Sequence, residues 1–145
     1  MKTLLMSVFI LITSSTVAQT RRVVIYPLTH NCRDFTFSVG ANSHIGTRCL
    51  AIVVPADEMD KLYAIHCDAT KRWDHCHETL DNAYWADVKG HHMNIWAQWE
   101  GNQHKGYSDK FIIDDITQSA KPFKDVQDID AFKKSDAFQK LTSRP

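Results

Sequence analysis

This chain has no excess of charge of either sign and no recognised catalytic motif. Seventeen lysines and arginines balance seventeen aspartates and glutamates, which gives a formal net charge of +0 at pH 7. Proteins that bind polyanions are usually distinctly basic, so this balance disfavours nucleic acid as the partner. The sequence contains no Gly-x-Ser-x-Gly elbow, Walker loop, GxGxxG or HExxH pattern, and no Asn-x-Ser/Thr sequon. It therefore predicts no enzyme of those motif classes, no cofactor and no N-glycosylation.

Long apolar runs are also scarce, and the one clear run lies near the N-terminus. Lys2 precedes the apolar run Leu4 to Ile12, and Thr16-Val17-Ala18 places small residues at the −3 and −1 positions of a cleavage site. A membrane-spanning helix needs about 20 apolar residues, and this run has roughly half that length. The layout is typical of a secretory signal peptide over residues 1–18. We therefore expect a secreted, extracellular mature protein with no membrane span.

A basic pair, Arg21-Arg22, follows the expected cleavage site and leaves two interpretations open. In the first, residues 19–22 are a short basic tail or pro-segment that is processed at this pair. In the second, the two arginines are solvated side chains just before the first strand. In both, the core domain begins at residue 23.

Four cysteines lie in the expected mature part, and none lies in the last 69 residues. An even number of cysteines in a small secreted chain is typical of structural disulfides. Four cysteines allow three connectivities, and the spacing does not choose among them. We expect two disulfides among Cys32, Cys49, Cys67 and Cys76.

A metal site is the alternative interpretation of the same region. Five side chains that ligate soft metals gather within residues 66–77, and thiolates with imidazoles suit zinc or copper. The spacing departs from that of compact zinc sites, and adjacent residues of a strand point to opposite faces. Disulfides are therefore favoured over this site, whose ligands would be His66, Cys67, His75, Cys76 and His77.

Hydrophobic patterning predicts a mainly antiparallel β structure. β-branched or alternating apolar residues indicate strands, and apolar residues at helical spacing before Gly90 indicate one short helix. Pro27 would end the first strand or place it at an edge, and the continuous apolar run at 49–54 indicates a strand buried on both faces. The expected strands are 23–28, 34–39, 49–54, 61–67, 92–99 and 107–113, with a loop at 40–46 and the helix at 78–88.

The last part of the chain differs in composition from the rest. Residues 115–145 lack cysteine, glycine and tryptophan and carry mixed charge. Apolar residues about three apart suggest one or two short amphipathic helices, docked on the sheet or partly mobile. The sequence as a whole predicts an α+β protein, mainly antiparallel β. Its small disulfide-bridged β-sandwich-like core would cover residues 23–114, followed by a helical extension at 115–145.

Eight histidines raise the hypothesis of a histidine-dependent hydrolase. Histidine can serve as a general acid or base near neutral pH, and a ribonuclease-like site needs two such groups and a cation. His66 or His92 could act with Arg72 or Lys89, although the spacing does not require it. No catalytic residue is therefore assigned. The histidines are His30, His44, His66, His75, His77, His91, His92 and His104.

Aromatic side chains supply the candidate contact residues. In a strand over 92–99, Trp96 and Trp99 would face opposite sides, so that one fills the core and the other is exposed or covered by the extension. Exposed tryptophan is enriched at binding hot spots. An amphipathic helix can also bind in a groove, which adds Phe132 and Phe138 of the extension as candidates.

The layout as a whole resembles the small secreted effector proteins of plant-pathogenic fungi. The shared features are the signal peptide, the short mature part, four cysteines, a short-stranded β core and the lack of an enzyme motif. The resemblance covers the entire chain and rests on architecture, so no functional residue is carried over from it. It implies a monomeric, non-enzymatic virulence effector that recognises a host protein, outside cells or after translocation into them. The hydrolase and the metal-binding protein remain the alternatives.

Overall fold

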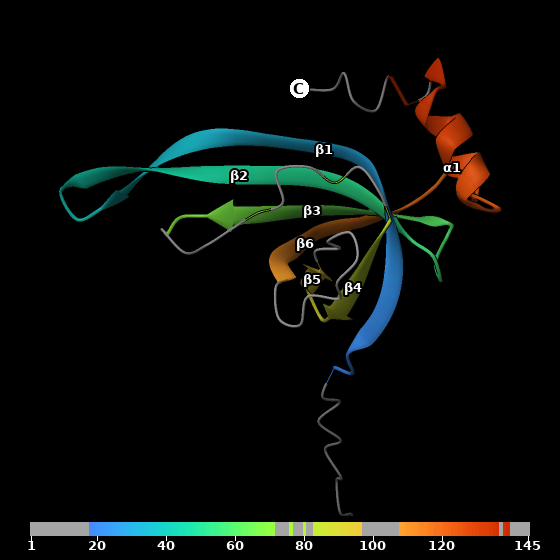
Figure 1. Ribbon diagram of the computed structural model, residues 1–145, viewed down its shortest axis with the longest axis horizontal. Coiled ribbons are helices and arrows are strands. Elements are labelled where there is room, and N and C mark those ends of the chain that lie inside the picture. The colour runs from blue at the N-terminus through green and yellow to red at the C-terminus, as the bar shows by residue number, and fades with distance from the viewer. Residues whose placement is uncertain are drawn as a thin grey trace, which may run out of the picture.

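The computed structural model describes residues 18–71, 76, 80, 83–96, 108–136, 138 and 139. These residues form six strands followed by one helix (Figure 1). The expected signal peptide lies almost entirely outside the described residues. The elements are β1 (Arg21–Val39), β2 (Asn42–Pro55), β3 (Lys61–Ala69), β4 (Tyr84–Lys89), β5 (His92–Trp96), β6 (Ser108–Gln118) and α1 (Val126–Lys133).

The six strands form one closed barrel in the order β1-β2-β3-β6-β5-β4, and every neighbouring pair is antiparallel. The expected class, α+β and mainly antiparallel with a helix near the C-terminus, is confirmed. The strands close on themselves, however, whereas a sandwich-like core has two packed sheets. Closure is possible because β1 pairs with both β2 and β4, which removes the free edges that a sandwich keeps.

Alternating side chains fill the barrel. Along β4, for example, Tyr84, Ala86 and Val88 are buried while Trp85 points outward and is 48% exposed. This alternation corrects the helix expected at 78–88. Leu80, Tyr84 and Val88 also fit a four-residue helical spacing, but the two-residue period of the strand buries Ala86 as well. Fully buried residues at the centre of the barrel include Ile25, Val53, Ile65, Met93, Ile95 and Phe111.

Strand β1 is longer than the sequence suggested. It runs through Pro27, where its register with β2 shifts between Pro27 and Thr29. A proline donates no ladder hydrogen bond, and such an irregularity is a place where a strand tolerates one. Arg21 and Arg22 belong to β1 and lie opposite Val88 and Asp87 of β4, so they are not a separate tail. The last strand of the barrel, β6, continues to Gln118 and so passes residue 114, where the core domain was expected to end.

A second apolar cluster lies outside the barrel and holds α1 against β1 and β2. Leu28 and Val54 are buried there together with Phe123 and Ile129. The helix begins at its N-cap Asp125, whose carboxylate accepts a hydrogen bond from the Asp128 backbone N–H. This cluster explains why β2 is buried on both faces only near its end. Leu50, earlier in the strand, points outward and is 41% exposed.

Two tight turns join β1 to β2 and β4 to β5. Gly40 and Gly90 have φ values of 62° and 58°, and no other described residue has a positive φ. A positive φ at the first central residue alone is the signature of a type II′ turn, which suits the twist of a hairpin. The loop expected at 40–46 is therefore only the Gly40-Ala41 turn, because β2 already begins at Asn42. Within the described residues, no helix is long and apolar enough to cross a membrane.

Candidate binding surface

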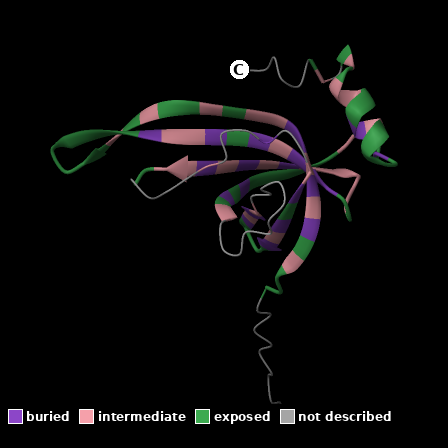
Figure 2. Ribbon diagram, in the orientation of Figure 1, coloured by how far each residue is buried: buried purple, intermediate pink, exposed green. Residues whose placement is uncertain are grey.

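The ends of β1 and β2 extend beyond the barrel as a hairpin, which we call the arm and define as residues 33–48 (Figure 1). Strand β3 pairs with β2 only as far as Thr47, opposite Ala69. In the described part of the chain, residues 35–46 therefore form a ribbon of two strands with no third neighbour. The ribbon is mostly exposed, in contrast to the alternating buried residues of the barrel strands (Figure 2).

One face of the arm carries aromatic rings, and we call it the aromatic face. Phe37 lies opposite His44 and stacks on it, with ring centroids 5.6 Å apart. Phe35 lies 5.7 Å from Phe37 and packs over Gly46, where an added Cβ would approach the Phe35 ring to 3.1 Å. The guanidinium of Arg48 lies 5.0 Å from the centre of the Phe35 ring. These residues form a continuous row of planar groups on a ribbon beneath which the described part of the chain places no core.

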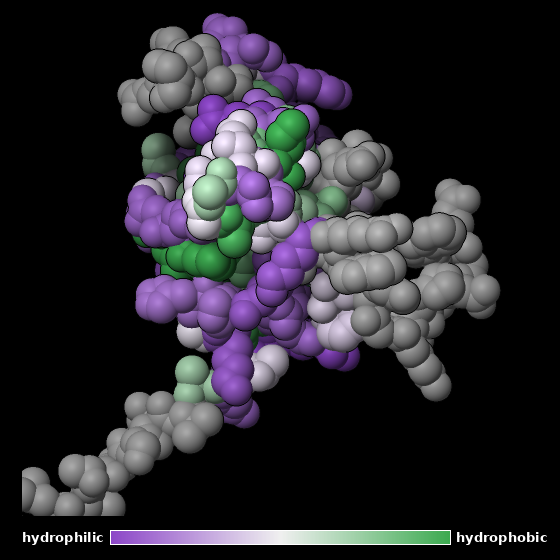
Figure 3. Space-filling view, turned by 90° about the vertical axis from the view of Figure 1, so that its left-hand side faces the viewer, coloured by the Kyte–Doolittle hydropathy of each residue, from purple (hydrophilic) through white to green (hydrophobic). Residues whose placement is uncertain are grey.

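The opposite face of the arm is mainly polar. Thr36 and Ser38 lie opposite Ile45 and Ser43, respectively. Ile45 is the only large apolar residue among these four and is 77% exposed. Seen from the end that carries the arm, hydrophobic side chains lie among hydrophilic ones and do not form one broad patch (Figure 3). The two faces of the arm thus differ in chemistry, which provides a matched control for mutagenesis.

Positive and negative side chains balance one another at the base of the arm. Arg48 binds Asp68 of β3 through two hydrogen bonds of 2.7 and 2.6 Å. The hydrogen bond from Arg48 holds the pKa of the Asp68 carboxyl below its ordinary value, although partial burial opposes this shift. The other arginine of the base, Arg33, lies opposite Arg48 and precedes Asp34. The arm is therefore not a concentrated positive patch.

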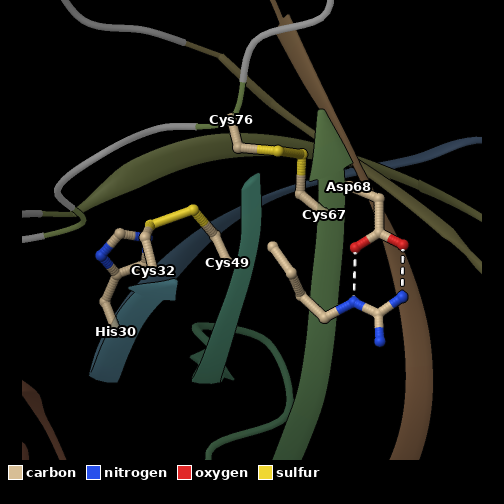
Figure 4. The surroundings of a disulfide bond; sticks show 7 residues. His30, Cys32, Cys49, Cys67, Asp68 and Cys76 are labelled. Carbon is tan, nitrogen blue, oxygen red and sulfur yellow. Dashed lines mark hydrogen bonds and ion pairs between the residues drawn. A yellow bond between two sulfur atoms is a disulfide. The ribbon is translucent and has the colours of Figure 1, made fainter. Parts of the chain in front are cut away.

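A disulfide lies at the base of the arm. Cys32 of β1 and Cys49 of β2 are register partners and are joined by one disulfide, and Cys67 and Cys76 are joined by the other (Figure 4). The expectation of two disulfides is confirmed and the open pairing is resolved. An isolated two-stranded hairpin is at best marginally stable in water. A cross-link at its base limits the unfolded conformations of the enclosed segment, so the Cys32–Cys49 bond stabilises the arm.

The same pairing corrects the metal alternative at residues 66–77. Cys67 and Cys76 are bonded to each other, so neither offers a thiolate in this state. His66 forms a hydrogen bond through Nδ1 to Asp114, 2.7 Å away. His75 and His77 lie outside the described residues.

The predicted contact residues lie elsewhere, on the outside of the barrel and beneath the helix. The Trp96 indole donates a 3.0 Å hydrogen bond to Asp87, which also binds Arg22. Phe132 and Phe138 pack edge-on, 5.9 Å apart, and join the cluster that attaches α1 to the barrel. These three aromatic side chains therefore contact their own chain. Trp99 lies outside the described residues.

The structure brings two of the histidines considered for catalysis into one row. His66 of β3 and His92 of β5 both lie opposite Ile112 of β6, and Lys89 lies opposite His92. The two histidines are separated by two strand spacings, about 9.5 Å, on the outer surface of a barrel. Side chains diverge on such a convex surface, and Ile112 lies between them. The register alone does not bring the two imidazoles together as a ribonuclease-like mechanism requires, and Arg72 lies outside the described residues.

Sequence reasoning missed the arm because its second strand was assigned to a loop. The first strand was predicted at 34–39 from the alternation of Phe35 and Phe37. The available signal was the glycine at position 40, which is suited to a two-residue hairpin turn, followed by polar residues alternating with His44 and Gly46.

Comparison with known protein families, curated proteins and solved structures finds no match for this chain. The candidate surface therefore rests on geometry and chemistry alone.

Proposed function

We propose that this chain is a secreted, disulfide-stabilised protein that recognises another protein through the aromatic face of its arm. The observation that carries the proposal is the row formed by Phe35, Phe37, His44 and Arg48 on a ribbon with no core of its own. Aromatic side chains, phenylalanine among them, and arginine are enriched in the cores of protein interfaces. Burial of the two phenylalanine rings against a partner would supply the apolar contact that the arm lacks.

The proposed partner is an extended polypeptide segment. Along residues 35–46, the outer backbone edges of both strands pair with no strand of the described chain. A polypeptide can add to such an edge by backbone hydrogen bonds, which neither a nucleic acid nor a small ligand can reproduce. The balanced charge at the base of the arm also favours a protein over a polyanion.

The role that we propose is that of a virulence effector that binds a host protein. Two disulfides suit a protein that works in an oxidising compartment. The N-terminal pattern that predicts secretion supports the same proposal. Recognition rather than catalysis is favoured because the half-buried rings of Phe35 and Phe37 lie in a row with the exposed His44 on the arm, whereas His66 and His92 lie two strands apart.

The test is a quantitative affinity capture with two matched variants. Phe37→Ser removes one ring from the aromatic face, and Ser38→Ala changes the neighbouring residue on the opposite face. A genuine partner should be enriched equally by the wild type and Ser38→Ala, and at least about tenfold less by Phe37→Ser, as expected for a hot-spot residue. Thermal unfolding of both variants should match that of the wild type, because both positions lie outside the core.

The proposal fails if no host or environmental protein shows this pattern. Equal capture by Phe37→Ser and the wild type would place the contact surface elsewhere on the molecule. Equal loss with both variants would show that the whole arm is disturbed, and the aromatic face would then have no special role.

A further inference from the structure

A histidine lies beside the disulfide at the base of the arm. His30 Nε2 is 3.5 Å from Cys32 Sγ (Figure 4). One donor atom from each of His30, Cys32 and Cys49 lies within 4.8 Å of the other two. Two sulfurs and an imidazole nitrogen are the donors that zinc and other soft metals prefer. In the oxidised protein the two sulfurs are bonded to each other, so this set cannot act as a pair of thiolates.

The β ladder, not the disulfide, positions these donors. Cys32 and Cys49 are register partners within a ladder between β1 and β2 that continues on both sides of them. His30 precedes Cys32 by two residues on the same strand, so both side chains point to one face. The residue opposite His30 is Ala51, which has a small side chain. Cleavage of the disulfide therefore leaves the three donors near one another.

A third sulfur lies on the next strand, outside the 4.8 Å group and bonded to Cys76, so it would have to turn toward the other donors after reduction. Cys67 of β3 is the register partner of Cys49, and the two disulfides lie side by side (Figure 4). Directly opposite side chains in an antiparallel pair have Cβ atoms about 5 Å apart, close enough for two sulfurs to share one ion. Together with His30, Cys32 and Cys49, this residue would complete a Cys₃His set.

The spacing agrees with tetrahedral coordination. With Zn–S and Zn–N distances of about 2.3 and 2.05 Å, a tetrahedral site places its nitrogen and sulfur atoms about 3.5 Å apart. The His30–Cys32 separation is already 3.5 Å. After reduction the sulfurs of Cys32 and Cys49 have to separate to about 3.8 Å, the distance between thiolate ligands of one zinc ion at these bond lengths, and the imidazole has to follow the Cys32 sulfur.

We propose that reduction converts the base of the arm into a zinc site formed by His30, Cys32, Cys49 and Cys67. Each disulfide takes two electrons from a thiol reductant such as glutathione, two molecules of which form a new disulfide and transfer two protons to the protein sulfurs. Zinc then displaces the protons of Cys32, Cys49 and Cys67, while Cys76 remains a thiol. In a reducing compartment, metal coordination would thus replace the covalent link at the arm.

The test is a Co²⁺ titration of the full mature chain, before and after reduction under anaerobic conditions. The reduced protein should bind one equivalent and show the thiolate-to-cobalt charge-transfer band and the strong visible bands of a tetrahedral site, which Zn²⁺ should abolish by displacement. The oxidised protein should show neither. His30→Gln should weaken binding at least about tenfold, the scale found even for residues that only orient a ligand. His92→Gln on the barrel exterior is the matched control and should leave binding unchanged.

A second pair of variants addresses the sulfurs. Cys67→Ser with Cys76→Ser should lower the charge-transfer intensity per cobalt, while Cys76→Ser alone should not. The proposal is overturned if the reduced protein gives no charge-transfer band. It is also overturned if His30→Gln binds as the wild type does, or if reduction unfolds the chain and the metal does not refold it.

Discussion

Strands β1 and β2 run through both the barrel and the arm, yet the two regions are stabilised in different ways. Within the barrel, residues such as Ile25 and Val53 are fully buried. In the arm, the same alternation continues, but Ile45 is 77% exposed because no layer formed by the described residues covers it. The ladder of β1 and β2 is continuous through both regions. The comparison shows that strand pairing extends a structure, whereas burial stabilises it, and that an arm with little burial depends on its disulfide.

The two regions also differ in the use of ion pairs. At one end of the barrel, Glu58 accepts hydrogen bonds from Lys61 and the buried Tyr63, and Arg21 lies 3.2 Å from the same carboxylate. The arm has one such pair at its base, between Arg48 and Asp68, whereas residues 35–46 take part in none of the ion pairs of the described residues. Charged side chains of the barrel thus form ion pairs with one another, whereas residues 35–46 of the arm offer side chains that are not engaged in such pairs.

Removal of a core ring should break the barrel and have the largest effect. Phe111→Ala would leave a cavity at a fully buried position, and we expect a loss of about 3–5 kcal/mol in the free energy of unfolding. The matched arm variant, Ile45→Ala, should change it by less than about 0.5 kcal/mol. Urea denaturation followed by tryptophan fluorescence measures both values. Similar losses for the two variants would contradict the distinction between barrel and arm.

Removal of the disulfide at the base of the arm should have the next largest effect. In the double variant Cys32→Ala and Cys49→Ala, we expect a loss of about 2–4 kcal/mol in the free energy of unfolding, because the cross-link restricts the unfolded chain. Amide hydrogen exchange should become faster mainly at residues 35–46, while β5 and β6 keep their relative protection. Uniformly faster exchange throughout the chain would show that the arm and the barrel unfold as one unit.

Acid should weaken the barrel by a smaller amount. The pKa of Glu58 is lowered by hydrogen bonds from Lys61 and Tyr63 and by the charge of Arg21, although burial acts most strongly in the opposite direction. The pKa of Asp87 is lowered chiefly by its hydrogen bonds with Arg22. Carboxyl groups with lowered pKa bind fewer protons in the folded chain than in the unfolded chain. Their stabilisation is therefore complete above the unfolded pKa of about 4, and it is lost as the pH falls through the folded pKa.

The measurement for this prediction is the urea midpoint as a function of pH. The titration of these carboxyl groups should leave the urea midpoint unchanged between pH 7 and about pH 5, and the midpoint should fall below about pH 4. Asp87→Asn should make the decline shallower, whereas Asp130→Asn on the exposed side of α1 should not. If Asp87→Asn leaves the decline of the urea midpoint at low pH unchanged, the Arg22–Asp87 pair does not contribute to the pH dependence.

The core of the fold could be predicted from the sequence, but the arm could not. Apolar alternation located strands that line the barrel, since burial on one face leaves a two-residue period in Tyr63 to Cys67 and in Met93 to Ile95. The segment at 84–89 was misassigned because residues four apart belong to both a helical and a strand pattern. Closure of the barrel depends on the pairing of β1 with β4, which is a contact between distant segments that no local pattern encodes.

The disulfides show the same division between local and long-range information. The even number of cysteines predicted two bonds, yet the pairing depends on register, which places Cys32 opposite Cys49. The candidate surface was missed for a related reason. The prediction favoured Trp96 and the rings of the extension, because large aromatic residues mark contact sites on average. In the folded chain, Trp96 is hydrogen-bonded to Asp87, and Phe132 and Phe138 pack in the second apolar cluster. Phe37, which the prediction did not select as a contact residue, lies on the arm and stacks on His44.

The most direct test of the account is to shorten the arm and then measure both stability and binding. Deletion of residues 34–39 and 42–47 joins Arg33 to Arg48 through the existing Gly40-Ala41 turn. In the native hairpin the turn follows the register pair Val39 and Asn42, and in the shortened one it would follow the register pair Arg33 and Arg48. The two pairs are an even number of residues apart along each strand, so every remaining side chain keeps its face of the ribbon. We predict that the shortened protein keeps the urea midpoint of the wild type within experimental error and captures none of the partner that the wild type binds. A shortened protein that unfolds, or one that still binds the partner, would contradict the division into a stabilising barrel and a recognising arm.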